Sequence, residues 1–175
     1  MKTLIGIAFL AAVSTPALAQ TVPPAPTVTE RTATPAYASM AMSGDNYEIE
    51  SSKLVLGNAV NPDVRAFADM MITDHGRMQS DMLAAAKAAS IGNPGGTRAP
   101  EAAMMKELRA TPKARMERFY VDQQVIAHER ALALHQGYAA QGDNPGMRAV
   151  AAAAIPVVQH HLDEIRRIQA AMHGN

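Results

Sequence analysis

Two junctions of nearly the same sequence do most to constrain the fold of this chain. Residues 61–68 read NPDVRAFA, and residues 144–151 read NPGMRAVA. In both, asparagine can cap the first turn of a helix, and proline can occupy the first helical position, where its missing N–H is not needed. Each junction follows one helical segment and opens the next, so the sequence predicts two antiparallel helical hairpins.

The segments around these junctions have the composition of helices. They are rich in Ala, Met and Leu and contain few aromatic residues. The stretch between the second and third long helices is long enough to run the length of a bundle, which permits a crossover connection. The predicted class is therefore all-α: a four-helix bundle made of two hairpins, with a long connection between helices 2 and 3. We expect long helices over residues 36–60, 62–90, 112–141 and 145–172, a loop over 91–98 and a short extra helix over 100–110.

Residues 1–19 have the three parts of a secretory signal peptide. Lys2 gives a positive start, and the uncharged apolar run that follows over residues 4–13 is too short to span a bilayer as an anchor. The small residues Ala17 and Ala19 occupy the two positions that a signal peptidase reads. We therefore expect cleavage after Ala19 and a periplasmic mature protein.

Composition narrows the remaining possibilities. Residues 20–35 are rich in Pro and Thr and are predicted to be a disordered tether, whereas residues 36–175 are predicted to be the bundle domain. The chain has 16 basic and 16 acidic side chains and no cysteine. We therefore expect no nucleic-acid partner, no thiolate metal site and, after the signal peptide, no membrane span.

Each of the last three long helices carries a histidine on its apolar stripe. His75, His128 and His161 lie among apolar residues spaced three or four apart, and Glu48 lies on one face of the first helix. In an antiparallel hairpin, residues equally far from the turn lie side by side. Glu48 is 13 residues before the first Asn-Pro junction and His75 is 14 after it, so these two are level.

The second hairpin brings its own pair of histidines level. His128 is 16 residues before the second junction, and His161 is 17 after it. At a rise of about 1.5 Å per residue, the first pair lies roughly 20 Å from its turn and the second roughly 25 Å. With a crossover connection the two turns lie at opposite ends, and all four groups then meet near the middle of the bundle. In an up-down bundle both turns lie at the same end, and the heights of the two pairs would differ by only about 5 Å.

Three imidazoles and a carboxylate inside a bundle are costly unless something satisfies them. A divalent transition metal would do so, and nitrogen and oxygen ligands suit Fe, Zn, Mn or Cu. We therefore predict that Glu48, His75, His128 and His161 bind one metal ion, in a protein of metal handling or oxidative-stress protection. The alternative is a non-catalytic structural or stress-related envelope protein, in which the histidines form a buried polar layer without metal.

Other polar residues near these positions are not expected to be metal ligands. His135 and His160 are expected to support the site or to lie at the surface. Three acids could orient the imidazoles from behind, although acids on a helix surface need no function. These acids are Asp74, Glu129 and Glu164.

Methionines on the second long helix offer a different metal site. Thioethers suit Cu(I), and four methionines lie near His75 in the sequence. A methionine stripe at helical spacing also serves as adaptable core filler, so both interpretations stay open. The methionines are Met70, Met71, Met78 and Met82.

The motifs of hydrolases and nucleotide-binding enzymes are missing from the sequence. It contains no Gly-x-Ser-x-Gly elbow, no nucleotide-binding glycine loop and no His-Glu-x-x-His motif. We therefore predict a binding protein rather than an enzyme. Pro156 lies inside the last predicted helix, five residues before His161, where it removes a backbone donor and is expected to kink the helix.

The segment EIESSKLVLGNAVNPDVRAFADMMITDH, residues 48–75, resembles the opening of the bacterial domain-of-unknown-function family 4142. The His-Glu pair at 128–129 and the spacing from Pro156 to His161 also fit the pattern of that family. The resemblance covers roughly residues 36–172. It implies an exported, ferritin-like four-helix bundle with no established activity, and it supports Glu48, His75, His128 and His161 as family-like polar positions.

The chain departs from this family pattern in two places. Ser51 and Ser52 stand where the family tends to have a larger apolar residue and Gly, and His160 doubles His161, which leaves open which of the two points inward. The ferritin likeness does not extend to a di-iron centre, because that centre needs Glu-x-x-His motifs. The residues three positions before the candidate histidines are Ile72, Val125 and Val158.

Overall fold

The computed structural model describes residues 33–59 and 61–174, and these residues form five helices and no strand. The predicted all-α class is confirmed, and the expected short helix before the third long one is a regular helix of 12 residues. The first helix begins at Thr34 rather than at residue 36. The predicted signal peptide and nearly all of the predicted tether lie outside the described residues. The helices are α2 (Thr34–Leu56), α3 (Pro62–Ala88), α4 (Ala99–Ala110), α5 (Lys113–Gln141) and α6 (Pro145–His173).

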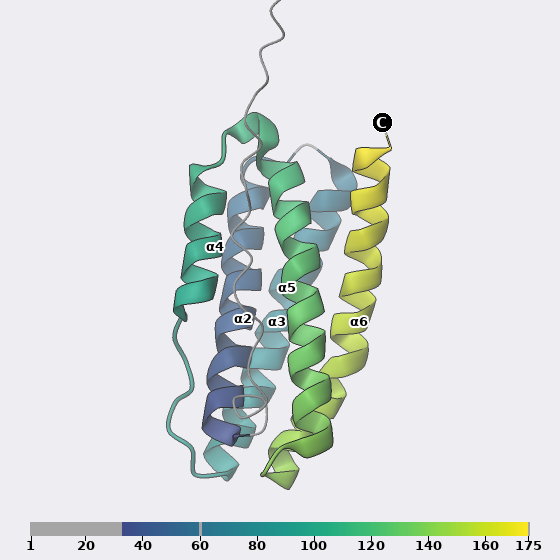
Figure 1. The fold of residues 1–175 in the computed structure, drawn as a ribbon. Coiled ribbons are helices and arrows are strands. Elements are labelled where there is room, and N and C mark those ends of the chain that lie inside the picture. The colour runs from purple at the N-terminus through teal and green to yellow at the C-terminus, as the bar shows by residue number, and fades with distance from the viewer. Residues whose placement is uncertain (1–32, 60, 175) are drawn as a thin grey trace, which may run out of the picture.

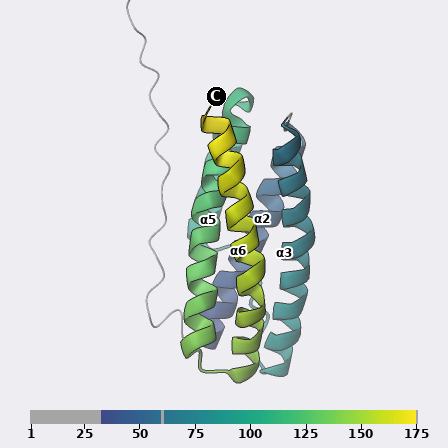
Figure 2. The same ribbon diagram turned by 90° about the vertical axis from the view of Figure 1, so that its right-hand side faces the viewer.

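The four long helices lie roughly parallel along one axis (Figure 1). α2 packs beside α3 and runs in the opposite direction, and α5 and α6 form a second such pair. The connection after α3 and the helix α4 return along the outside of α2, so that α5 runs in the same direction as α3 (Figure 1). Seen from the side, α6 lies between α5 and α3 (Figure 2), and it packs against both.

The two Asn-Pro junctions start helices as the sequence predicts. The Oδ1 atom of Asn61 accepts hydrogen bonds from the backbone N–H groups of Asp63 at 2.9 Å and Val64 at 3.4 Å. The Oδ1 atom of Asn144 accepts one from the N–H of Met147 at 3.0 Å. Each asparagine thereby satisfies helix donors that have no partner inside the helix.

The returning segment is held to α2 by polar contacts. The Ser43 hydroxyl accepts a hydrogen bond from the backbone N–H of Arg98 at 2.7 Å and donates one to Glu101 Oε2 at 2.8 Å. The Asn46 side chain donates to the Gly96 carbonyl at 3.0 Å. These contacts fix the start of α4 beside the middle of α2.

The apolar core is divided into two main clusters at opposite ends of the bundle. One cluster joins the end of α2, the start of α3, the start of α5 and the end of α6, and it includes Phe67, Tyr120 and Ile165. The other joins the opposite ends of the same helices and includes Tyr37, Tyr138 and Met147. The candidate histidines belong to neither cluster, and they occupy the polar layer between the two. Helix α6 continues on both sides of Pro156.

Replacing Asn61 by alanine should lower the free energy of unfolding by about 1 kcal/mol, because two backbone donors of α3 lose their partner. Asn61→Gly should cost only a few tenths of a kcal/mol, since glycine leaves those donors open to water. Urea denaturation of both variants measures the difference. Equal stability of Asn61→Ala and the unchanged protein would contradict the capping role.

Candidate metal centre

Three histidines from three helices meet in the middle of the bundle. His75 of α3, His128 of α5 and His161 of α6 are at most 2% exposed. Their ring centroids are 5.7 Å apart for His75 and His128, 5.3 Å for His75 and His161, and 5.5 Å for His128 and His161. One ring nitrogen from each lies within 4.8 Å of those of the other two, which is close enough for one ion to reach all three.

One nitrogen of each imidazole is already fixed by an oxygen atom. The Nδ1 of His75 lies 2.7 Å from Asp45 Oδ1, and the Nε2 of His161 lies 3.1 Å from Asp74 Oδ2. The Nδ1 of His128 donates to the backbone carbonyl of Gln124 at 2.9 Å. Because a carbonyl and an ionised carboxylate only accept hydrogen bonds, these nitrogens carry the protons.

The opposite nitrogen of each ring then carries a lone pair in the neutral imidazole. These atoms are Nε2 of His75, Nε2 of His128 and Nδ1 of His161, and none has a hydrogen-bond partner among the described residues. Buried acceptors without a partner are costly, and here three occur in one layer. Oxygen atoms behind metal-bound imidazoles fix the ring in the same way, so the arrangement suits a cation at the centre.

The local electrostatics keep two of the rings neutral. Burial, together with the neighbouring His75, holds the pKa of His128 well below its usual 6.5. Burial and His75 also lower the pKa of His161 to about 4, although the hydrogen bond to Asp74 opposes the shift. Burial acts in the same direction on His75, but the hydrogen bond and charge of Asp45 outweigh it, so the pKa of His75 is raised.

Glu48 lies beside the three histidines, but it is not one of the residues whose ligand atoms lie within 4.8 Å of one another. It is buried on α2, and its Oε1 is 3.9 Å from the Nδ1 of His128. Its Oε2 has no hydrogen-bond partner in the described part of the chain. Burial raises the pKa of Glu48 to about 7, against the opposing effects of His75 and Gln124. A cation nearby would favour its ionised form.

Sequence reasoning missed Asp45, which holds His75. This aspartate is buried and lies three residues before Glu48, so it shares a face of α2 with that glutamate. That spacing is the signal that could have revealed it. Asp74 does contact an imidazole, as expected for an orienting acid, and the imidazole belongs to His161.

The other two acids that could have oriented imidazoles bind surface arginines, as acids without a role in the site would. Glu129 binds Arg166 at 2.7 Å, and Glu164 binds Arg167 at 2.7 Å, in pairs that are half-exposed. Both acids satisfy surface arginines because their positions point away from the core stripe of their helices.

The two remaining candidate histidines have different positions. His160 is exposed and His161 is buried, so the structure settles which of the pair points inward. His135 is buried one layer away from the three histidines, where its Nδ1 lies 3.0 Å from the hydroxyl of Tyr37. Burial lowers the pKa of His135 to about 4.

The four methionines of α3 occupy different surroundings. Met71 is fully buried in the apolar cluster that contains Phe67, and Met70 packs against the same cluster. Met78 and Met82 instead line a cavity between α3 and α6, together with His135. Met82 also belongs to the apolar cluster that contains Tyr37, so core packing and the cavity wall share the methionine stripe.

His135 should make the metal-free protein less stable in acid. Its folded-state pKa is about 4, below the ordinary 6.5, so the unfolded chain binds more protons between these values. Stability is thus lost as the pH falls from about 6.5 to about 4, by about 3 kcal/mol for this group. Urea denaturation of the protein and of His135→Gln across this range, with a chelator present, should show the smaller loss in the variant. Parallel curves would contradict this assignment.

Comparisons with known proteins agree with this architecture. Residues 17–168 match the family described as Domain of unknown function (DUF4142). A solved structure described as "CopM in the Cu(II)-bound form" superposes with a TM-score of 0.67 at 14% sequence identity, over 80% of this chain and 97% of that one. No curated protein matches the sequence. Of the helices in the described part of the chain, none combines the length and hydropathy needed to cross a bilayer. Since the family match spans most of the sequence, this chain belongs to the DUF4142 family.

Proposed function

We propose that this protein binds one transition-metal ion between His75, His128 and His161. The supporting observation is that three buried imidazole nitrogens, each with its partner nitrogen held by an oxygen atom, lack any hydrogen-bond donor among the described residues. A cation offers all three lone pairs one shared partner. Glu48 is proposed as the fourth ligand, since its Oε2 is buried without a hydrogen-bond partner among the described residues, on a side chain whose Oε1 lies 3.9 Å from Nδ1 of His128.

The donor set points to a borderline transition metal. Neutral imidazoles with a carboxylate suit Zn, Cu, Fe or Mn. CopM is a copper-bound protein of similar fold, and this likeness makes Cu(II) the first ion to test. Fold similarity at 14% identity does not carry the copper site over by itself, so the argument depends on the histidines of this chain.

The burial of the site favours holding a metal over catalysis. All three imidazoles are at most 2% exposed, which leaves a substrate no direct approach to the ion. We therefore propose metal handling or protection from metal-driven oxidation, by an exported protein of the periplasm. The fold proposed for it is a ferritin-like arrangement of four long helices in two hairpins, with α4 as an addition.

A second candidate function is structural, and one observation favours it. Each imidazole already has one good hydrogen bond, so the histidines could serve as a buried polar layer without metal. Such a layer helps to specify one packing of the helices. In the first candidate function the free nitrogens bind a metal ion, and in the second they do not. One substitution distinguishes the two.

His128→Leu is the cleanest substitution, because the carbonyl that His128 contacts belongs to the preceding turn of the same helix and keeps its backbone hydrogen bond. In the metal-free protein the variant should be as stable as the unchanged chain, or more stable by up to about 2 kcal/mol, since it removes a buried acceptor without a partner. Thermal or urea denaturation with a chelator measures this. A loss of more than about 2 kcal/mol would instead favour the structural layer.

Metal binding itself is tested by titrating the purified mature protein with Cu(II), Zn(II), Fe(II) and Mn(II). One ion per chain should be retained through gel filtration. A ligand at 100 times its dissociation constant should raise the free energy of unfolding by about 2.7 kcal/mol. His128→Leu should abolish both effects, whereas His160→Leu, which changes an exposed histidine, should leave them intact. Unchanged stability with all four ions would refute the proposal.

A further inference from the structure

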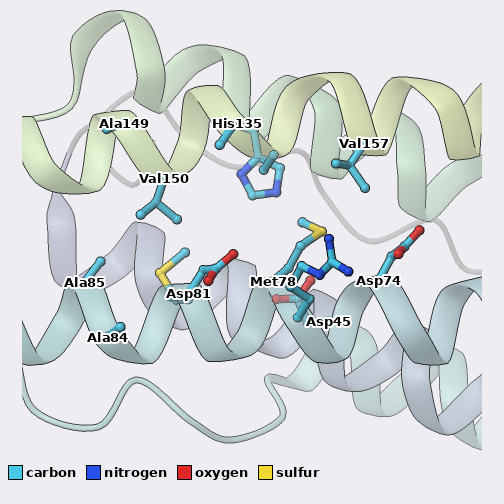
Figure 3. A pocket seen from close by; sticks show the side chains of 14 residues that line it. Asp45, Asp74, Met78, Asp81, Ala84, Ala85, His135, Ala149, Val150 and Val157 are labelled. Atoms are coloured by element: carbon cyan, nitrogen blue, oxygen red, sulfur yellow. The ribbon is translucent and has the colours of Figure 1, made fainter.

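A cavity of about 540 Å³ lies between α3 and α6 (Figure 3). The space is open because the facing residues are small, with Ala84 and Ala85 on α3 and Ala149 and Ala153 on α6. Ala84, Ala149 and Ala153 are exposed, so the cavity faces solvent at this side of the bundle. Its volume exceeds the roughly 180 Å³ of six water molecules, so a hydrated ion fits inside.

The carboxylates that hold two of the candidate ligands are part of the cavity wall. Asp45 and Asp74 line the cavity, and the same side chains contact His75 and His161. Asp74 is 33% exposed at its side chain, whereas the imidazoles behind it are buried. The two carboxylates, and behind them the rings of His75 and His161, therefore stand between the cavity and the free nitrogens.

Other sides of the histidine layer are packed. The ring of Phe67 lies edge-on to His128 at 5.9 Å and to His161 at 6.4 Å, and it belongs to the larger apolar cluster. On the side of α2, the amide of Gln124 donates to the hydroxyl of Ser51 at 3.2 Å, and both residues are fully buried. An ion arriving by these sides would have to displace core side chains.

The charges of the cavity favour a cation. Three carboxylates line it, from Asp45, Asp74 and Asp81, against the one guanidinium of Arg77. Asp81 is exposed, and its carboxylate lies at the cavity among apolar walls (Figure 3). Carboxylates in a hollow with apolar walls raise the local concentration of cations and speed their arrival.

We propose that this cavity is the access route by which a hydrated divalent cation reaches the three histidines, with Asp74 as the first carboxylate to receive it. The proposal rests on the proposed metal site. The ion enters past Asp81, exchanges one coordinated water for an Asp74 oxygen, and passes inward as the side chains of Asp74 and His161 turn. Each later exchange replaces a coordinated water with an imidazole nitrogen. These steps are ligand exchanges, so the ion keeps its oxidation state and no covalent bond of the protein breaks.

The first test is to obstruct the route with Ala153→Phe, using Ala152→Phe as the matched control. Both alanines are exposed neighbours on α6, and only Ala153 of the two lines the cavity. Stopped-flow mixing with Cu(II) alone should give association at least about tenfold slower for Ala153→Phe than for the control. The equilibrium affinity should change by less than about threefold, because a blocked route slows entry and release alike.

The second test removes charge at the mouth. Asp81→Asn should slow association about two- to fivefold at low salt, and the difference should shrink as ionic strength rises. Asp69→Asn is the control, since it removes an exposed carboxylate of the same helix that does not line the cavity. The route would be overturned if Ala153→Phe bound Cu(II) as fast as Ala152→Phe, and Asp81→Asn as fast as Asp69→Asn. The metal site is tested separately, by the affinity of the unchanged protein for Cu(II) in an equilibrium titration.

Discussion

The structure depends on a polar layer that cannot satisfy itself. Each of the three imidazoles forms a hydrogen bond to an oxygen atom through one nitrogen, and the opposite nitrogen is buried without a partner among the described residues. A neutral imidazole whose donor is engaged has only an acceptor left to offer. Three buried ring nitrogens without a partner need a hydrogen-bonding group or a cation, and no described side chain forms a hydrogen bond with any of them.

This layer also explains how the bundle is organised. The apolar residues form two main clusters, one at each end, and the layer stands between them at the height where all four long helices contribute. The clusters supply the burial that stabilises the fold, so the middle can hold groups that cost stability. The aspartates behind His75 and His161 come from neighbouring helices, which ties the orientation of the rings to the packing of the bundle.

Much of this could be read from the sequence, for physical reasons. The Asn-Pro junctions carry their own capping chemistry, so the starts of α3 and α6 follow from local residues. Counting residues from those junctions also placed His75, His128 and His161 at one height, because the rise of a helix is fixed. The buried position of His161 relative to His160 agrees with its place on the apolar stripe.

What the sequence could not supply depends on tertiary contacts. Asp45 contacts His75 from another helix, and the residues next to either one in the sequence do not indicate this pairing. Glu129 and Glu164 stand next to candidate ligands in sequence or space, yet they bind surface arginines, because a residue beside a ligand on a helix usually points elsewhere. The space between α3 and α6 that Met78 and Met82 line likewise depends on how the two helices pack, with small residues facing each other.

The central claim is that a metal ion fills the space between the three nitrogens, and anomalous diffraction from a crystal of the metal-loaded protein tests it most directly. The account predicts one anomalous peak at about 2.0–2.1 Å from Nε2 of His75, Nε2 of His128 and Nδ1 of His161. A water molecule bridging these nitrogens, with no anomalous peak near them, would contradict it.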